Sequence, residues 1–411
     1  MENTTTTPTP HPVSRLTAEE WLIVSILAAV NFTHIMDFVI MMPLGPQLIR
    51  VFGIDAQRFG LVVSSYTFSA AISGLLGAFF IDRFDRKKAL VTTYLGFSIG
   101  TLLCAFAPNY STLVGARIFA GAFGGLVGSL VFSILGDAVD VSRRGRATGI
   151  VMSAFSLASV IGIPVGLELA VRFDWHAPFV LLGVGSLLAC ALAAWRLPSL
   201  RGHLEIRPSE KRDPMREMGS ILTDRNHQRA FLLTIAMMFA GFSVIPFMSP
   251  YMVSNVGLQE KQLSWIYLCG GLFTFFSSQI IGFLCDRYGK HRMFAVMALT
   301  SIPAILLVTH LPPLPLPLAL ACTTLFMVTV SGRFVPTMAL VTSAAAQGRR
   351  GGFMSVNSCI QQGSSGLASL AGGLILTTSA SGALLHYNVV GYMAVAATLL
   401  CLFLARNIVT R

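Results

Sequence analysis

Long apolar stretches follow one another along almost the whole 411-residue chain, and polar residues gather in the short segments between them. A helix needs about 20 consecutive apolar residues to cross the hydrocarbon core of a bilayer. The pattern predicts an all-α membrane protein with about twelve transmembrane helices, over residues 22–47, 59–81, 89–108, 112–136, 147–171, 177–197, 229–254, 262–284, 293–311, 318–342, 352–378 and 389–405.

The first apolar stretch has a recognisable start. Residues Thr17-Ala18-Glu19-Glu20 have the form of a capping box, in which a Thr and a Glu three residues apart satisfy the first free amides of a helix. The preceding segment is polar and rich in Thr and Pro, so we expect it to be disordered.

Two landmarks recur half a chain apart, at offsets of 204 and 206 residues: Asp82-Arg83 recurs as Asp286-Arg287, and Arg143-Arg144-Gly145 recurs as Arg349-Arg350-Gly351. Two loops in nearly one register predict two pseudo-symmetric bundles of six helices each, which is a known transporter plan. The expected division is a disordered N-terminus (1–20), an N-terminal bundle (21–197), a linker (198–228), a C-terminal bundle (229–405) and a short tail (406–411).

Composition supports a membrane location. Hydrophobic residues make up 54% of the chain and charged residues only 11%, whereas a soluble domain carries roughly 25% charged residues. The net charge of +11 would suit nucleic acid, but Lys and Arg lie on alternate loops, 23 on one side and 4 on the other. This positive-inside pattern predicts a multi-pass plasma-membrane protein, such as one of the bacterial inner membrane, with both termini and the linker in the cytoplasm.

With these motifs the chain resembles the major facilitator superfamily over about residues 20–405. The Asp-Arg turns are similar to that family's loop G-x-x-x-D-R-x-G-R-K between spans two and three. The second copy fits at Gly282, Asp286, Arg287, Gly289 and Lys290, and the first departs with Ala78 and Asp85 in place of two glycines. The resemblance implies a transporter whose two halves rock around a central site.

Two further stretches narrow the resemblance. Arg117 begins a run similar to the family's R-x-x-Q-G-x-G motif, with Ala120 in place of Gln, and this implies a role in proton coupling. Gly162-Ile163-Pro164-Val165-Gly166 resembles the Gly-Pro motif of efflux antiporters. The nearest patterns are those of twelve-span drug:proton antiporters and sugar-efflux-permease-like exporters. The same glycines also suit close helix packing.

Asp37 is the candidate for chemistry that the sequence favours most. It lies in the middle of the first span, and the other acid within a span, Glu168, lies near a span's outer end. A charged carboxylate in the bilayer core costs roughly 2.5–3.5 kcal/mol on insertion scales, so it needs a partner, a wet cavity or a proton. We expect a proton-coupling site at Asp37, with His34 on the same helix face. The alternatives are an anchor for a cationic substrate and a structural hydrogen bond.

Other polar residues within spans are candidates for the substrate cavity: Asn31, Arg333, Asn357, Gln361 and Gln362. Arg333 could bind an anionic part of a substrate or tie its span to a neighbour, and the sequence leaves both open. A buried arginine needs an acidic or carbonyl partner in either case.

The two Asp-Arg turns predict a conformational switch. Asp82 and Asp286 each follow a span on the cytoplasmic side, and pseudosymmetry places them opposite the starts of spans eleven and five. A carboxylate at a helix N-terminus gains roughly 0.3–1 kcal/mol. Such contacts would form only when the cytoplasmic side is closed. The switch group comprises Asp82, Arg83, Arg86, Asp286, Arg287, Gly289, Arg143 and Arg349.

These features favour a secondary active transporter that exports a small organic solute in exchange for protons, with a proton-coupled uptake symporter as the alternative. The chain contains no HExxH, GxSxG or Walker motif, so an enzyme or an ATP-driven pump is disfavoured. A membrane sensor would carry a larger polar domain. The seven cysteines form no CxxC pair and are interpreted as packing residues. We expect no cofactor, metal or nucleic-acid partner, and a monomer in contact with lipid.

Overall fold

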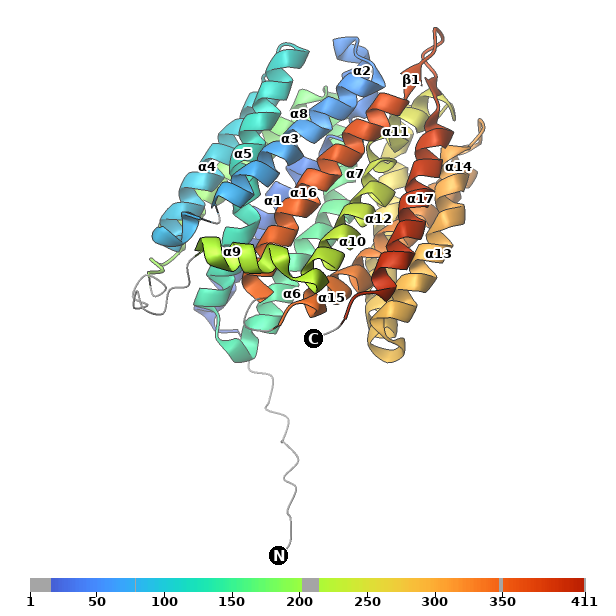
Figure 1. The fold of residues 1–411 in the computed structure, drawn as a ribbon. Coiled ribbons are helices and arrows are strands. Elements are labelled where there is room, and N and C mark those ends of the chain that lie inside the picture. Colours follow the sequence, from blue (N-terminus) through green and yellow to red (C-terminus); the bar gives the residue numbers. More distant parts are fainter. Residues whose placement is uncertain (1–15, 78, 202–213, 347–349, 410–411) are drawn as a thin grey trace, which may run out of the picture.

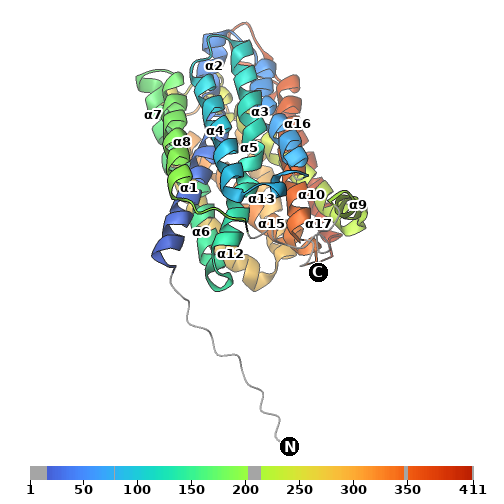
Figure 2. The ribbon, with the colours of Figure 1, turned by 90° about the vertical axis from the view of Figure 1, so that its left-hand side faces the viewer.

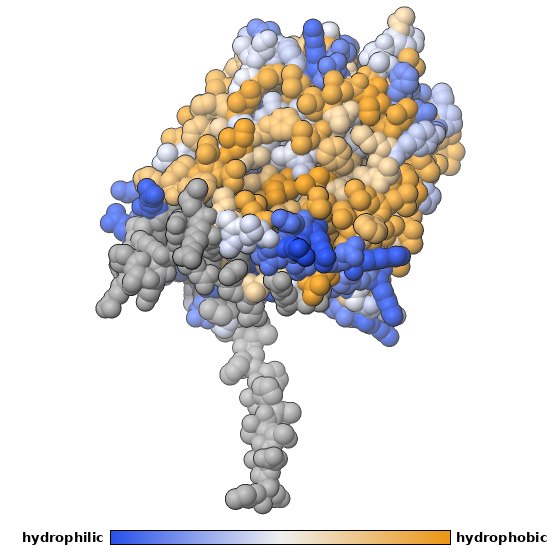
Figure 3. Space-filling view, viewed as in Figure 1, coloured by the Kyte–Doolittle hydropathy of each residue, from blue (hydrophilic) through white to orange (hydrophobic). Residues whose placement is uncertain are grey.

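The computed structural model describes residues 16–77, 79–201, 214–346 and 350–409. The start of α1 (Ala18–Ile40) and the end of α17 (Tyr387–Arg406), the first and last helices of this part of the chain, lie at the same end of a helical bundle (Figure 1). We call this end the terminal face and the other end the opposite face. On the face shown in Figure 3, apolar side chains form a broad band across the bundle, and polar side chains gather toward its two ends. The all-α membrane fold is thereby confirmed.

The first half begins where the capping box predicts, because Glu20 accepts a hydrogen bond from the Thr17 amide at 2.9 Å and the Thr17 hydroxyl accepts one from the Glu20 amide at 3.2 Å. Its helices are α1 (Ala18–Ile40), α2 (Gly45–Phe52), α3 (Ala56–Gly77), η1 (Ile81–Arg83), α4 (Arg86–Ala105), α5 (Tyr110–Ala138), α6 (Val141–Leu157), η2 (Ala158–Gly162), α7 (Ile163–Arg172) and α8 (His176–Arg196).

The second half follows a helix, α9 (Pro214–Thr223), that lies across the terminal face (Figure 1). A short hairpin, β1 (Thr377–Thr378) with β2 (Leu384–Leu385), stands at the opposite face. The helices of this half are α10 (Arg225–Phe242), α11 (Ile245–Ser254), α12 (Glu260–Tyr288), α13 (Lys290–Thr309), α14 (Leu316–Gly332), α15 (Phe334–Ala344), α16 (Arg350–Ile375) and α17 (Tyr387–Arg406).

Several spans are broken at related places in the two halves. The first span of each half is divided, between Ile40 and Gly45 and between Phe242 and Ile245, and a proline follows directly as Pro46 or Pro246. Proline has no amide hydrogen and cannot continue the preceding helix, although it suits the first turn of a new one. The first predicted span of each half therefore consists of a long helix and a short one.

Eleven spans among the described residues are long and apolar enough to cross a membrane, and α16 is the twelfth helix of spanning length, with 26 residues. Its sequence contains Asn, Gln and several Ser and Gly residues, which lower its hydropathy. It packs along α3 of the first half and α10 of the second, and lies beside α3 in both ribbon views (Figures 1 and 2). A polar span is tolerated there because protein covers much of its surface.

Candidate functional site

Asp37 and Arg117 form an ion pair in the interior of the first half. Arg117 Nη1 lies 2.7 Å from Asp37 Oδ2 and 3.3 Å from the Asp37 carbonyl oxygen, and both side chains are fully buried. The Thr101 hydroxyl donates to Asp37 Oδ1 at 3.0 Å. Helices α1, α4 and α5 thus each supply one polar group to a single cluster. A buried charge is stable only when it is paired in this way.

Aromatic side chains surround the ion pair. The Arg117 guanidinium carbon lies 4.4 Å from the ring centroid of Tyr66, a cation–π contact with α3. One turn before Asp37 on α1, Thr33 and the Tyr94 hydroxyl are hydrogen-bonded at 2.6 Å. The Arg117 atoms Nε and Nη2 have no hydrogen-bond partner within the described parts of the chain.

His34 lies beside this pair. Its half-buried ring makes an edge contact with Phe97, with 5.5 Å between ring centroids, and its Nε2 atom is buried near Gly124 without a hydrogen-bond partner among the described residues. The structure therefore brings together the three residues expected to couple protons.

This arrangement has a clear chemical capacity. A proton on Asp37 would cancel its charge, weaken the bond to Arg117 and leave a buried cation without its counter-ion. Breaking a buried pair in this way costs several kcal/mol. Protonation of Asp37 would therefore require a rearrangement around Arg117, and such linkage would couple proton binding to conformation.

The candidates for the substrate cavity separate into two groups. The Asn31 amide donates to the Val151 carbonyl at 3.0 Å, and Asn357 accepts from the Thr234 hydroxyl at 2.7 Å. Both asparagines are buried and join neighbouring helices within one half. Their side-chain oxygens and nitrogens are thus used, at least in part, for packing.

Arg333 belongs with these buried residues. It is 1% exposed, at the junction of α14 and α15, and it donates to the Thr398 hydroxyl at 2.8 Å and to the Ala240 carbonyl at 3.3 Å. It forms no ion pair among the described residues. Of the two roles left open by the sequence, its contacts favour the tie between spans.

Gln361 and Gln362 differ from the other candidates, because both are half-buried on α16 and form no side-chain hydrogen bond within the described residues. Their amides are therefore free to bind another polar group. Glu168, near the end of α7, is half-buried and pairs with Arg172 at 2.6 Å.

The Gly162-Pro164-Gly166 stretch packs against α1. A Cβ atom at Gly162 would lie 2.2 Å from the sulfur of Met36, and one at Gly166 would lie 2.7 Å from Cδ1 of Ile40. Glycine at both positions lets the two helices approach closely. Gly162 is the last residue of the five-residue π-helix η2, and Pro164 lies in the first turn of α7. The stretch thus supports the helix that carries Asp37.

The two halves meet closely at the opposite face. Aromatic pairs connect them, Phe38 with Phe242 and Phe59 with Phe247, with 5.9 and 6.1 Å between ring centroids. Arg50 at the end of α2 also forms an ion pair with Glu260 at the start of α12. This face is therefore closed.

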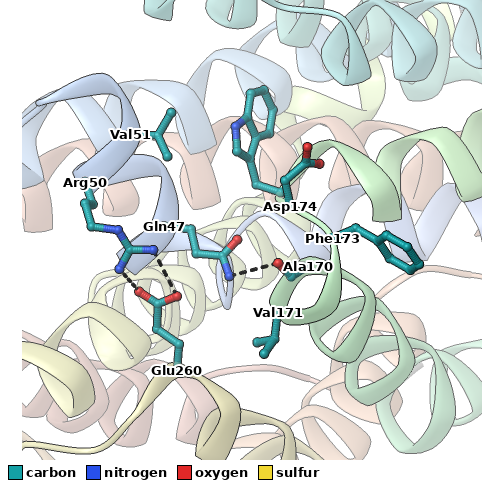
Figure 4. A pocket seen from close by; sticks show the side chains of 9 residues that line it. Gln47, Arg50, Val51, Ala170, Val171, Phe173, Asp174 and Glu260 are labelled. Atoms are coloured by element: carbon teal, nitrogen blue, oxygen red, sulfur yellow. Dashed lines mark hydrogen bonds and ion pairs between the residues drawn. The ribbon is translucent and has the colours of Figure 1, made fainter.

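Figure 4 shows a pocket of about 280 Å³ beside that ion pair. Gln47 donates to the Ala170 carbonyl at 3.3 Å within it, and Asp174 lies at its rim. Because the pocket is lined by residues of both halves, its shape depends on the closed state of this face. It lies at the opposite face and does not contain the Asp37 cluster.

The Asp-Arg turns at the terminal face make few contacts in this structure. Asp286 and Arg287 are exposed, and Asp286 forms no hydrogen bond or ion pair within the described ranges. Arg83 is exposed too. The side chain of Asp82 and all of Arg349 lie outside the described residues, so the expected contacts with the start of α16 stay a prediction.

Other members of the switch group have partners nearby. Arg143 pairs with Glu20 at 3.0 Å, and Arg86 pairs with Asp137 at 3.3 Å. Both ion pairs join helices of the first half. Gly289 connects α12 directly to α13 with a φ of 89°, which a residue with a side chain rarely adopts.

Asp85, which stands where the second turn has Gly289, has a different role from that glycine. It is buried at the start of α4, and burial raises its pKa. Hydrogen bonds outweigh this effect and lower the pKa to about 2. The donors are the Ser199 hydroxyl, the Lys87 amide (2.9 Å), Arg201 Nε (3.2 Å) and the Leu200 amide (3.3 Å). The turn is thereby fastened to the segment that follows α8.

Sequence reasoning missed Tyr66, Thr101 and Gly124. A single Tyr or Thr in an apolar span carries no signal that separates a ligand of a charged group from an ordinary packing residue. Gly124 belongs to the glycine-rich run after Arg117, so its closeness to the Asp37 cluster could have been suspected from that motif.

The helices form two halves, and the first of them encloses a buried ion pair. The family model described as Major Facilitator Superfamily matches residues 27–239 and 230–410. The chain belongs to the major facilitator superfamily, as the sequence motifs predicted. It is 25% identical over 371 residues to an uncharacterized MFS-type transporter, YceJ, of Bacillus subtilis (strain 168), covering 90% of this chain and 92% of that protein.

Solved structures share the fold. The crystal structure of a D-xylose-proton symporter matches with a TM-score of 0.74 and 17% identity, covering 93% of this chain and 97% of the other. A bacterial homologue of the human lysosomal transporter Spinster, inward-facing and unoccupied, matches with a TM-score of 0.71 and 14% identity, covering 96% and 95%. The inward-open xylose transporter XylE from E. coli also matches, with a TM-score of 0.71 and 16% identity, covering 93% and 95%.

Proposed function

We propose that this protein is a proton-coupled exporter of a small organic solute, working by alternating access, and that Asp37 is its proton-coupling residue. The observation that carries the proposal is the fully buried Asp37–Arg117 pair. A carboxylate held by one arginine in the membrane interior is stable in the charged state, and a proton removes the attraction that holds it. Proton binding and movement of the helices are then linked.

The direction of transport rests on a resemblance. The Gly162-Ile163-Pro164-Val165-Gly166 stretch is similar to the motif of efflux antiporters, and it packs against the helix that bears Asp37. An uptake symporter is the runner-up. The half-buried Gln361 and Gln362 are proposed as cavity residues that bind polar groups of the solute.

A dye experiment separates exporter from symporter. Purified protein is placed in liposomes that contain the pH dye pyranine, and a panel including ethidium and D-xylose is added outside. In an antiporter, protons leave as the solute enters, so the interior becomes alkaline. In a symporter protons enter with the solute, so an acidified interior would overturn the export proposal.

The Asp37→Asn variant tests the coupling residue in the same liposomes. We expect it to lose gradient-driven transport and to keep part of its energy-independent exchange, because the amide cannot exchange a proton. Thr33→Val, a polar change on the same helix, is the matched control and should retain driven transport. Full proton-driven transport by Asp37→Asn would exclude this role.

We also propose that the terminal face is cytoplasmic, since most Lys and Arg residues lie at that face. Single cysteines at Ser209 and Ser381, in a functional background without other cysteines, should react with membrane-impermeant reagents from opposite sides. Labelling from the same side would refute this orientation. In this orientation the opposite face points to the outside, so a protein whose opposite face is closed is in a state shut toward the outside.

A further inference from the structure

Four buried polar atoms around the Asp37–Arg117 pair have no hydrogen-bond partner among the described residues: His34 Nε2, Tyr66 Oη, and Arg117 Nε and Nη2. A buried polar atom without a partner costs about 1–3 kcal/mol. Such groups call for an explanation, such as a bound water or a catalytic role. Here they come from three helices, α1, α3 and α5, and they surround one ion pair, which indicates a site for a small polar molecule.

Gly124 lets two of these atoms lie close to α5. A Cβ atom at this position would lie 2.4 Å from Tyr66 Oη and 3.4 Å from His34 Nε2. Both atoms therefore lie beside the same residue of α5 although they come from different helices, and they are close enough together for one water molecule to bond to both. The first distance is too short for any side chain at position 124 unless Tyr66 moves. Glycine is therefore required here by the contact itself.

Asp37 needs such a site, because it has no direct access to solvent. Its side chain is 0% exposed, one carboxylate oxygen accepts from Thr101, and the other accepts from Arg117. A proton can therefore reach it only through neighbouring groups. His34, one helical turn away, is half-buried, and its imidazole can both accept and release a proton.

We propose that His34 and Tyr66 form the path by which protons reach Asp37, with one water held between His34 Nε2 and Tyr66 Oη and with Gly124 keeping the space for it. This inference rests on the proposed function, in which Asp37 takes up the coupling proton. It names a positioning residue, Tyr66, and a space-keeping residue, Gly124. The ligand is water, which carries the proton and is regenerated.

The step balances as a proton transfer. Protonated His34 gives its Nε2 proton to the water, and the water gives one of its own protons to a carboxylate oxygen of Asp37. The N–H bond breaks, one O–H bond forms on Asp37, and His34 returns to its neutral form. The bond between Arg117 and Asp37 weakens as the carboxyl group becomes neutral. Tyr66 donates or accepts one hydrogen bond to hold the water and does not change its protonation state.

The groups that face His34 determine its response to pH. The charged groups nearest to it are Asp37 on its own helix and Arg117 on α5. Tyr66 on α3 is neutral, and so is Tyr94 on α4, which stacks on Phe97 with 5.8 Å between ring centroids. The test should therefore follow the proton on Asp37 itself rather than a pH profile alone.

Time-resolved infrared spectroscopy provides that test without a known substrate. The full-length protein in liposomes is subjected to a rapid drop in pH, and the carboxylic C=O band that Asp37→Asn removes is followed in time. We expect Tyr66→Phe, His34→Gln and Gly124→Ala each to slow the rise of this band about tenfold or more, within the range of general acid–base effects. Gly128→Ala is the matched control, because a Cβ there meets nothing within 4 Å.

A double variant separates a role for the water from a simple clash. Tyr66→Phe removes the hydroxyl that the Cβ of Gly124→Ala would touch, so a purely steric defect would be relieved in Gly124→Ala/Tyr66→Phe. We expect that double variant to remain slow. Rates equal to those of Gly128→Ala in the single variants, or recovery in the double variant, would overturn the proposal. An infrared band or driven transport unaffected by Asp37→Asn would instead contradict the proposed function.

Discussion

The two halves of this transporter bury different kinds of polar groups. The first half encloses an ion pair, Asp37 with Arg117, while the second encloses an arginine, Arg333, whose partners are a hydroxyl and a carbonyl. Among the described residues of the second half no Asp or Glu is buried. Pseudo-symmetric bundles with similar spans thus differ in whether a proton can change their internal charge balance.

This difference indicates a division of roles. The partners of Arg333 do not titrate in the physiological range, so its contacts are the same on both sides of a pH gradient. The bond between Asp37 and Arg117 depends on the protonation of a carboxylate. In the proposed function the first half therefore senses the gradient, and the second half, with its polar α16, contributes neutral side chains toward the solute.

The largest expected effect breaks the ion pair from one side. Arg117→Ala leaves a carboxylate buried without a counter-ion, which costs roughly 3–5 kcal/mol. We expect a lower unfolding midpoint in an SDS titration and loss of gradient-driven transport. The double variant Arg117→Ala/Asp37→Asn should recover most of the stability but none of the proton coupling. An Arg117→Ala protein as stable as the wild type would contradict the buried pair.

The two Asp-Arg turns allow a comparison at the terminal face. Exchanging their fourth residues gives Asp85→Gly and Gly289→Asp. Asp85→Gly loses the helix cap, which costs roughly a few tenths of a kcal/mol when glycine replaces it, and also loses the bonds from Ser199, Leu200 and Arg201, each worth about 0.5–1.5 kcal/mol. Gly289→Asp forces a side chain into a glycine conformation at about 1–3 kcal/mol. We expect both to lower the thermal unfolding temperature, followed by tryptophan fluorescence in detergent. Gly282→Ala, where a Cβ meets nothing within 4 Å, is the control. No change in either variant would mean that the turns are interchangeable.

The contribution of Asp85 has a defined pH window. Its pKa is lowered from 3.8 to about 2, so the folded state favours its charged form. The resulting stability is fully present above pH 3.8 and is lost as the pH falls through about 2. The difference between wild type and Asp85→Gly should therefore be constant at neutral pH and shrink only in acid.

How much of this could be predicted from the sequence differs between the site's residues. Asp37 and Arg117 could be selected because charges are rare within spans, and the capping box fixed the start of α1. Their pairing could not be predicted, since it depends on which helices are neighbours. Tyr66 is one of 8 tyrosines in a largely apolar chain, and only its contact with Arg117 distinguishes it. The neutral partners of Arg333 likewise exist only in the packed bundle.

A third prediction tests the neutral character of the second half. Arg333→Met removes a buried cation without leaving an unpaired carboxylate, and the Thr398 hydroxyl still donates to the Ala394 carbonyl at 2.8 Å. We expect a loss of about 0.5–1.5 kcal/mol in the SDS titration, with proton-driven transport retained. Loss of coupling as complete as that of Arg117→Ala would show that the halves are less different than their contacts indicate.

The smallest effect concerns the ion pair between the halves. Arg50 and Glu260 join α2 to α12 at the closed opposite face, and the Arg50 side chain is 66% exposed. Exposed pairs contribute about 0.2–1 kcal/mol, so Arg50→Gln should shift the ratio of the two states by less than about fivefold, toward opening of this face.

In the proposed switch Asp82→Asn and Asp286→Asn act in the other direction, because their contacts would form when the terminal face is shut. Spin labels at the terminal-face ends of α5 and α15, read by pulsed distance measurements, should therefore report opposite shifts for Arg50→Gln and Asp286→Asn. Added salt should mimic Arg50→Gln in the wild type and have little further effect in the variant. Shifts in the same direction would show that the two faces do not alternate through these contacts.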